Sequence, residues 1–307
     1  TEYRIQKCRM GFSPCWSSKI GVHSTPYLFY ALTIFILSGC GSNIIKPLPV
    51  CPGKANVTES LAALQSQSEN MITLYTNNGN FSIQYYDNDK MQKQHFQIRH
   101  LLIKPPSEIF LQAKTGIIDK AMVLGSNTQD FWLEVKPDPI NSYWWGKWSD
   151  QDEDAGIMIN PKTMLEALGI YEDRETTDEG RDVNWSLANE GPYDILTKTE
   201  RGIICKKLYI YCCDYRVKKI EYFDRYGKPI VLAKLDKYTE VSPGFFIPFS
   251  IKINSLNKNV EDTFNIEIAL DTIIPATEKQ ANFKVVLPKT PSVEHVYQIV
   301  NGDWIEQ

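Results

Sequence analysis

The spacing of hydrophobic positions changes at a turn near residue 79. Before it, seven side chains recur every three or four positions, which predicts one amphipathic helix: Val57, Leu61, Leu64, Ser68, Met71, Ile72 and Tyr75. Asn56 followed by Glu59 is a capping-box pattern, so we expect the helix to begin there. Asn77-Asn78-Gly79 is a turn signal, and beyond it the period becomes two, as in a strand.

Strand-like runs fill most of the remaining sequence. Two of them, over 246–254 and 262–270, contain strict alternation, in 249–254 and 264–270, which is typical of an antiparallel sheet with one packed face and one wet face. Further strands are predicted over 81–86, 95–103, 108–114, 120–126, 130–136, 202–211, 216–223, 228–238 and 281–287. Asp224-Arg225-Tyr226-Gly227 is a hairpin signal between two of these runs.

A second helix is predicted in the middle of the chain. Asn160 is its N-cap, Pro161 its first residue and Gly169 its terminator, with a buried edge formed by Met164, Leu165 and Leu168. Irregular acidic stretches flank it at 149–156 and 171–182.

The amino-terminal part has the features of an export signal. Four basic residues, Arg4, Lys7, Arg9 and Lys19, precede the uncharged apolar run Tyr27–Leu37. Eleven residues suit a secretory signal but not a membrane-spanning helix, which needs about 20. If translation starts at Met10, only Lys19 and His23 remain as the positive flank.

The tetrapeptide Leu37-Ser38-Gly39-Cys40 directly follows that run and resembles the bacterial lipobox. The resemblance implies cleavage before Cys40, three acyl chains on the new terminus and a membrane partner reached through them. Gly41, in place of an aspartate, favours the outer membrane, on its periplasmic face. We therefore expect a signal peptide over 1–39, a Pro-rich tether over 40–56 and one domain over 57–307. That mature chain carries 29 basic and 36 acidic residues, a net charge of −7.

Two phrases, GSNTQDFWLEVKPDP over 125–139 and KKIEYFDRYGKPIVLAKLDKYTEVSPGFFIPFSIKIN over 218–254, resemble the LolA/LolB family of lipoprotein carriers and receptors. The resemblance implies a mainly β (α+β) fold, in which a single curved antiparallel sheet forms an unclosed half-barrel with covering helices. It also implies a concave apolar cavity that binds or transfers a lipid, an acyl chain or a lipoprotein ligand. We expect the protein to be a monomer. The candidate ligand-binding residues come from the alternating strands: Phe81, Ile83, Phe96, Ile98, Phe131, Leu133, Phe249, Ile251, Phe264 and Ile266.

Composition and motifs narrow the function classes. The 307 residues are 43% hydrophobic with a net charge of −4, which excludes a disordered chain and a broadly basic nucleic-acid binder. No GxSxG motif and no Cys/His arrangement occurs, so no enzyme and no cofactor are predicted. No CxxC pair with metal-ligand spacing is present, and the acidic cluster Asp150, Asp152, Glu153 and Asp154 lacks the EF-hand spacing, so no metal site is predicted.

Two alternatives stay open at this stage. The aromatic string from Tyr143 to Trp148 would bind envelope polysaccharide if exposed, as in a structural or adhesive lipoprotein, and would form a packed strand if buried. An exported protein could oxidise two of Cys51, Cys205, Cys212 and Cys213, and free thiols or one disulfide are both compatible with the sequence.

Overall fold

The computed structural model describes residues 48–68, 71–87, 90–150, 161–170, 182–256, 263–288, 292–300 and 303–307. All of them belong to one compact unit, Leu48–Gln307. The predicted signal peptide, Cys40 and most of the acidic cluster fall outside the described residues. No helix in the described ranges has the length and hydrophobicity needed to cross a membrane.

One mixed sheet contains all seventeen strands of the described ranges. They are β1 Leu74–Thr76, β2 Gly79–Asp87, β3 Lys90–Lys104, β4 Glu108–Thr115, β5 Ile118–Ser126, β6 Asp130–Val135, β7 Ser142–Lys147, β8 Val183–Glu190, β9 Tyr193–Glu200, β10 Ile203–Tyr211, β11 Arg216–Phe223, β12 Pro229–Ser242, β13 Phe245–Ser255, β14 Phe264–Leu270, β15 Ile274–Pro275, β16 His295–Val300 and β17 Asp303–Glu306.

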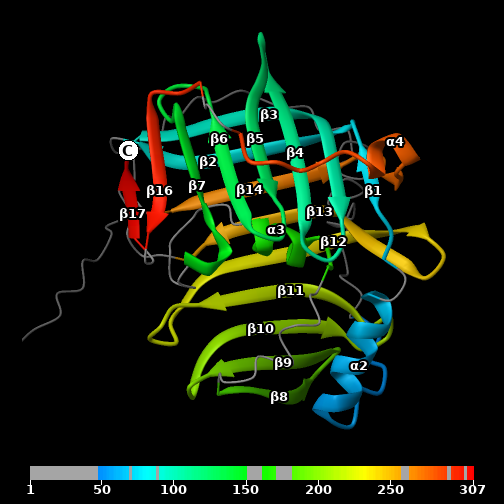
Figure 1. Ribbon diagram of the computed structural model, residues 1–307. Coiled ribbons are helices and arrows are strands. Elements are labelled where there is room, and N and C mark those ends of the chain that lie inside the picture. The colour runs from blue at the N-terminus through cyan, green and yellow to red at the C-terminus, as the bar shows by residue number, and fades with distance from the viewer. Residues whose placement is uncertain are drawn as a thin grey trace, which may run out of the picture. The chain divides into compact units, whose positions relative to one another are not determined.

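The strand pairings run from β8 through β9, β10, β11, β12, β13 and β14 to β2, and then through β3, β4, β5, β6, β7 and β16 to β17 (Figure 1). Every pair is antiparallel except β7 with β16, which is parallel. Within the described residues β8 and β17 pair on one side only, so the sheet is unclosed. The prediction of a mainly β fold with an open sheet is confirmed, and its all-antiparallel character is wrong at this one pair.

The long strand β3 connects two parts of the sheet, the part that contains β2 and the part that begins with β4. Its first half, as far as Gln97, pairs with β2, and its second half pairs with β4. The register shifts between Ile98 and His100, and such a bulge bends a strand. Beyond this bend, β4 to β7 cross in front of β2 and β14 (Figure 1).

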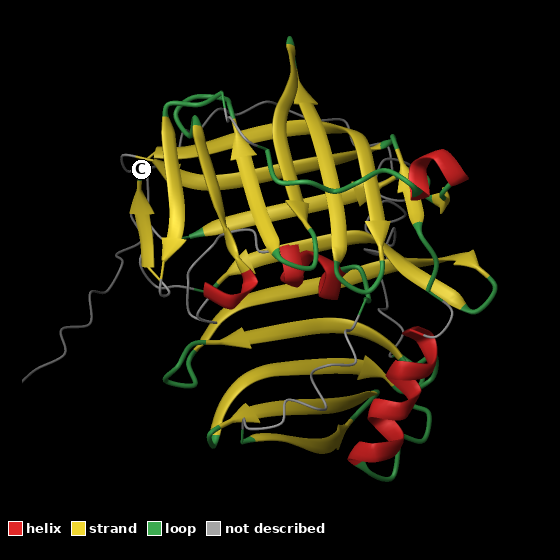
Figure 2. Cartoon of the chain, in the orientation of Figure 1, coloured by secondary structure: helices red, strands yellow, loops and turns green. Residues whose placement is uncertain are grey.

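Three α-helices occur in the described ranges: α2 Val57–Ser68, α3 Pro161–Ala167 and α4 Glu278–Ala281; the 3-10 helix η1 spans Trp148–Asp150 (Figure 2). The predicted cap of α2 is confirmed, because the Glu59 amide donates to Asn56 Oδ1 at 2.9 Å. The helix is shorter than predicted. Leu74–Thr76 forms β1, which pairs with β3 and β15, so pairing with distant strands overrides the helical spacing there.

The largest hydrophobic core lies on the inner face of the sheet, where alternate residues from β2–β6 and β9–β14 pack with α2 and α3. A smaller core forms around Trp132, which points to the opposite face of β6 from Leu133. Val285 and Leu287 pack on Trp132. The strand predicted over 281–287 is wrong, because α4 ends at Ala281 and the residues that follow cover this outer face instead of joining the sheet.

Candidate functional site

Nine of the ten predicted ligand-binding residues belong to the inner core of the sheet, and Phe131 does not. Seven are buried members of the inner core and two, Phe249 and Phe264, are partly buried and pack against it; the seven are Phe81, Ile83, Phe96, Ile98, Leu133, Ile251 and Ile266. Phe131 is buried at another place, with its ring 4.6 Å from that of Trp148 and 6.4 Å from that of Trp304. Alternation therefore selected nine residues that share one apolar core, and their role in ligand binding stays a prediction.

Helix α3 packs into this core. Met164, Leu165 and Leu168 are buried as predicted, and Gly169 ends the helix with a φ of +81°. That conformation is left-handed and suits glycine, which explains why the helix stops there. The predicted N-cap, Asn160, lies outside the described residues. A short helix from the middle of the chain thus covers part of the apolar inner face.

A polar cluster attaches α3 to the sheet. Lys206 Nζ on β10 lies 3.0 Å from Glu166 Oε1, and Tyr222 on β11 donates its hydroxyl to Glu166 Oε2 at 2.7 Å. Glu166 and Lys206 are each only 6% exposed. Removing either partner would leave a buried charge uncompensated, which typically costs about 3–5 kcal/mol, so the pair holds α3 in this position.

Lys206 belongs to a row of side chains that crosses four neighbouring strands. Trp185, Lys198, Lys206 and Tyr222 are direct cross-strand partners from β8 to β11. Lys198 is 6% exposed and pairs with Glu200 at 2.7 Å. We call these four residues the polar row.

The polar row was not predicted from the sequence, although a signal for it was present. Lys206 shares its strand face with Leu208 and Ile210, and Lys198 shares its face with Leu196. A lysine at an inward position of an alternating strand is unusual, because charged groups are rarely buried without a partner.

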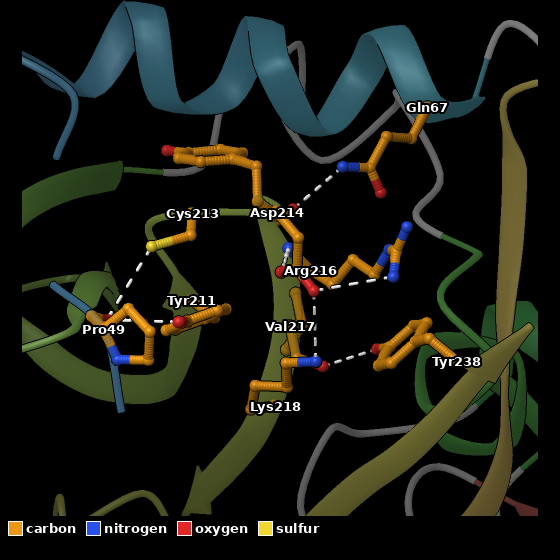
Figure 3. A network of polar contacts seen from close by, with 10 residues as sticks. Pro49, Gln67, Tyr211, Cys213, Asp214, Arg216, Val217, Lys218 and Tyr238 are labelled. Carbon is orange, nitrogen blue, oxygen red and sulfur yellow. Dashed lines mark hydrogen bonds and ion pairs between the residues drawn. The ribbon is translucent and has the colours of Figure 1, made fainter. Parts of the chain in front are cut away.

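A second set of contacts fixes the segment that precedes α2. Cys51 forms a disulfide with Cys213 in the turn between β10 and β11. Tyr211 donates its hydroxyl to the Pro49 carbonyl at 3.1 Å, and the Lys54 amide donates to Asp194 at 2.8 Å. Figure 3 shows Pro49 beside Tyr211 and Cys213. The described part of the predicted tether, 48–56, is therefore attached to the domain.

Helix α2 is attached to the same turn. Gln67 donates to the Tyr215 carbonyl at 2.8 Å, next to Asp214, which pairs with Arg216 and Lys218 (Figure 3). The Tyr215 hydroxyl lies 2.6 Å from Ser60 Oγ. Burial raises the pKa of Tyr215 to about 12, so this phenol stays protonated at any physiological pH.

The aromatic string forms β7, which lies between β6 and β16 and not at an edge. Tyr143 is buried, and Trp144, Trp145 and Trp148 are half-buried. The Trp144 ring stacks on Tyr297 with centroids 5.9 Å apart. The structure therefore places this string in packing contacts.

Comparison with known proteins identifies the fold. No family model matches the sequence, and no curated protein matches it. Among solved structures, the chain is similar to a putative outer membrane lipoprotein-sorting protein domain from Vibrio parahaemolyticus. The TM-score is 0.50 at 11% identity, over 73% of this chain and 95% of that one. The chain has a LolA-like fold.

Two further structures are similar at lower scores. A LolA superfamily protein from Nitrosomonas europaea has a TM-score of 0.48 at 10% identity, over 75% of this chain and 99% of that one. A DUF1329 family protein from Desulfovibrio piger has a TM-score of 0.48 at 9% identity, over 72% and 92%. The fold expected from the two sequence phrases is confirmed by the likeness to the Vibrio domain, which at 11% identity concerns the fold alone.

Proposed function

We propose that this protein is a non-enzymatic envelope lipoprotein that binds or transfers a lipid or acyl moiety on the inner face of its sheet. The observation that carries the proposal is the continuous apolar inner face of an unclosed LolA-like sheet, part of which is covered by the short helix α3. The outer membrane lipoprotein-sorting description of the similar Vibrio domain supports a role of this kind.

The energetics favour an acyl ligand. Each buried CH₂ contributes about 0.8 kcal/mol, so one long chain gains several kcal/mol without any polar contact. Phe81, Ile83, Ile251 and Ile266 are each 6% exposed or less, so a ligand reaches them only if a covering element moves. We infer that α3 is this element, because it is a helix of seven residues whose Glu166 makes its contacts with Lys206 and Tyr222 of the sheet.

Binding can be tested on a chain that begins at Gly41, because every described contact lies within Leu48–Gln307. We expect acyl species to copurify with this chain and to be detected by native mass spectrometry. Phe249→Asn and Phe264→Asn place polar groups on the partly buried rim of the inner face and should reduce the bound fraction. Asn265→Ser, on the opposite face of β14, is the matched control. A folded chain that binds no acyl compound would refute the proposal.

The second part of the proposal is the anchor at Cys40, on the periplasmic side of the outer membrane. Cys40 and the disulfide-bonded Cys51 are eleven positions apart, and an extended chain of that length spans at most about 40 Å. The domain would therefore stay close to the bilayer. Cys40→Ala should abolish labelling by a clickable fatty acid, whereas Cys205→Ala should leave it unchanged. Undiminished labelling of the Cys40 variant would refute the lipobox assignment.

A further inference from the structure

Two lysines face each other inside the sheet. Lys198 on β9 and Lys206 on β10 are direct cross-strand partners, and each is 6% exposed. Like charges placed directly opposite destabilise a sheet, and burying an ammonium group costs free energy unless it is paired. Packing alone does not account for this pair, and each ammonium group has a carboxylate partner.

The neighbours of the two lysines on the polar row are also hydrogen-bond donors. Tyr222 donates its hydroxyl, and Trp185 Nε1 is buried without an acceptor within the described part of the chain. Indole N–H groups are donors only. The row thus presents two ammonium groups, a phenol and an indole to the inner face, which is the chemistry that binds a carboxylate or a phosphate.

The carboxylate that meets Lys206 and Tyr222 does not come from the sheet. It is Glu166 of α3, the helix that covers the inner face. Lys198 forms an ion pair with Glu200 of its own strand at 2.7 Å. One anionic position on the row is therefore supplied by a helix and not by a strand of the sheet.

An apolar row lies beside the polar row, two residues along each strand. It runs in register through eight strands, from β8 to β2: Leu187, Leu196, Leu208, Ile220, Ala233, Ile253, Ile266 and Ile83. If the charged head of a ligand bound at Lys206, its hydrocarbon tail could lie along this apolar row. The two rows together match an amphiphile with one anionic head.

We propose that Trp185, Lys198, Lys206 and Tyr222 form a headgroup site for an acyl lipid with a carboxylate or phosphate head, and that Glu166 occupies this site when no ligand is bound. The ligand head displaces the Glu166 carboxylate, which releases α3 from the sheet and opens the apolar row to the tail. The inference rests on the proposed function and names the class of ligand that the inner face accepts.

The test compares three radiolabelled probes in equilibrium dialysis with the chain that begins at Gly41. Palmitate has the tail and the charge, 1-hexadecanol has the tail alone, and acetate has the charge alone. A hydrogen bond to a charged group contributes about 1.5–3 kcal/mol, so we expect palmitate to bind at least about tenfold more tightly than 1-hexadecanol. Acetate should not bind at the same concentrations.

Substitutions test whether the polar row causes the preference for palmitate over 1-hexadecanol. Glu166→Gln removes the competing charge and should raise the palmitate-to-hexadecanol affinity ratio about fivefold or more. The double variant Glu166→Gln, Lys206→Gln removes both charges of the buried ion pair. Its palmitate-to-hexadecanol affinity ratio should fall to about 1, and 1-hexadecanol should still bind. Lys219→Gln is the matched control, because Lys219 lies on the other face of β11 and pairs with Glu221. Circular dichroism establishes that each variant is folded.

The outcomes separate the two proposals. If palmitate and 1-hexadecanol bind equally and the ratio does not respond to the variants, the headgroup site is refuted and acyl binding stands. Acetate binding as tight as that of palmitate also refutes it, because the site would then be an anion site without a lipid. If neither tailed probe binds, the proposed function itself fails.

Discussion

Cys51 and Cys213 form a disulfide that joins residues 162 positions apart, so the segment before α2 is linked covalently to the turn after β10. The bond restricts the unfolded chain over a long loop, for which the chain-entropy model gives about 5 kcal/mol. Native disulfides usually contribute about 2–5 kcal/mol.

Cys51→Ser should therefore lower the free energy of unfolding by about 2–5 kcal/mol, measured by denaturant titration without reductant. Cys205→Ser is the control, since Cys205 is outside the disulfide. A Cys51 variant as stable as the parent would mean that the bond does not form in the protein.

Because Cys212 lies beside the disulfide, we expect a different result when Cys213 is replaced. The Cys51 amide donates to Cys212 Sγ at 3.1 Å, and the three sulfur atoms lie within 4.8 Å of one another. In Cys213→Ser, Cys51 should therefore pair with Cys212. Peptide mapping by mass spectrometry of the non-reduced protein would detect this bond. Recovery of both cysteines as alkylated thiols would contradict the prediction.

His100 should make stability depend on pH. Its ring lies 5.0 Å from Tyr75, 5.4 Å from Phe110 and 5.5 Å from Phe283, measured between centroids. Burial lowers the pKa of His100 from 6.5. The unfolded state then binds the proton more readily, so this contribution is present above about pH 6.5 and is lost as the pH falls towards the folded-state pKa.

His100→Phe keeps the aromatic packing and removes the titration. We expect the loss of unfolding free energy between pH 7.5 and 5 to be smaller in this variant than in the parent. His295→Phe is the comparison, because His295 is exposed and pairs with Glu306. Parallel pH profiles for the parent and His100→Phe would contradict the assignment.

Gly125 should be intolerant of a side chain. A Cβ added there would lie 2.1 Å from the indole ring of Trp132, which is fully buried against Tyr143 and Val285. Gly125→Ala should cost about 1–3 kcal/mol, seen as a lower Tm with a changed near-UV signal from Trp132.

The matched control for this variant is Gly116→Asn. Gly116 has a φ of +46° and no atom within 4 Å of an added Cβ, and asparagine tolerates that conformation. Its Tm should change much less than that of Gly125→Ala. Equal effects of the two substitutions would mean that contact with Trp132 is not the cause.

Sequence patterns were reliable where the local signal and the tertiary environment agree. Asn56 caps α2, Gly169 ends α3, and the strict alternation in β13 and β14 matches their buried and exposed faces. The sequence patterns predicted the wrong element where contact with a distant part of the chain determines the local structure. Leu74–Thr76 has helical spacing but pairs with β3, and 281–287 has a strand-like composition but packs on the outer face.

The sequence by itself determined that this chain is mainly β with one apolar face on its strands, because alternation directs side chains to two faces whatever the order of the strands. Only the tertiary structure decided which residues meet across it. Cys51 with Cys213, and Glu166 with Lys206, lie far apart in sequence and carry no local signal of their pairing. Strand order and register bring these partners together.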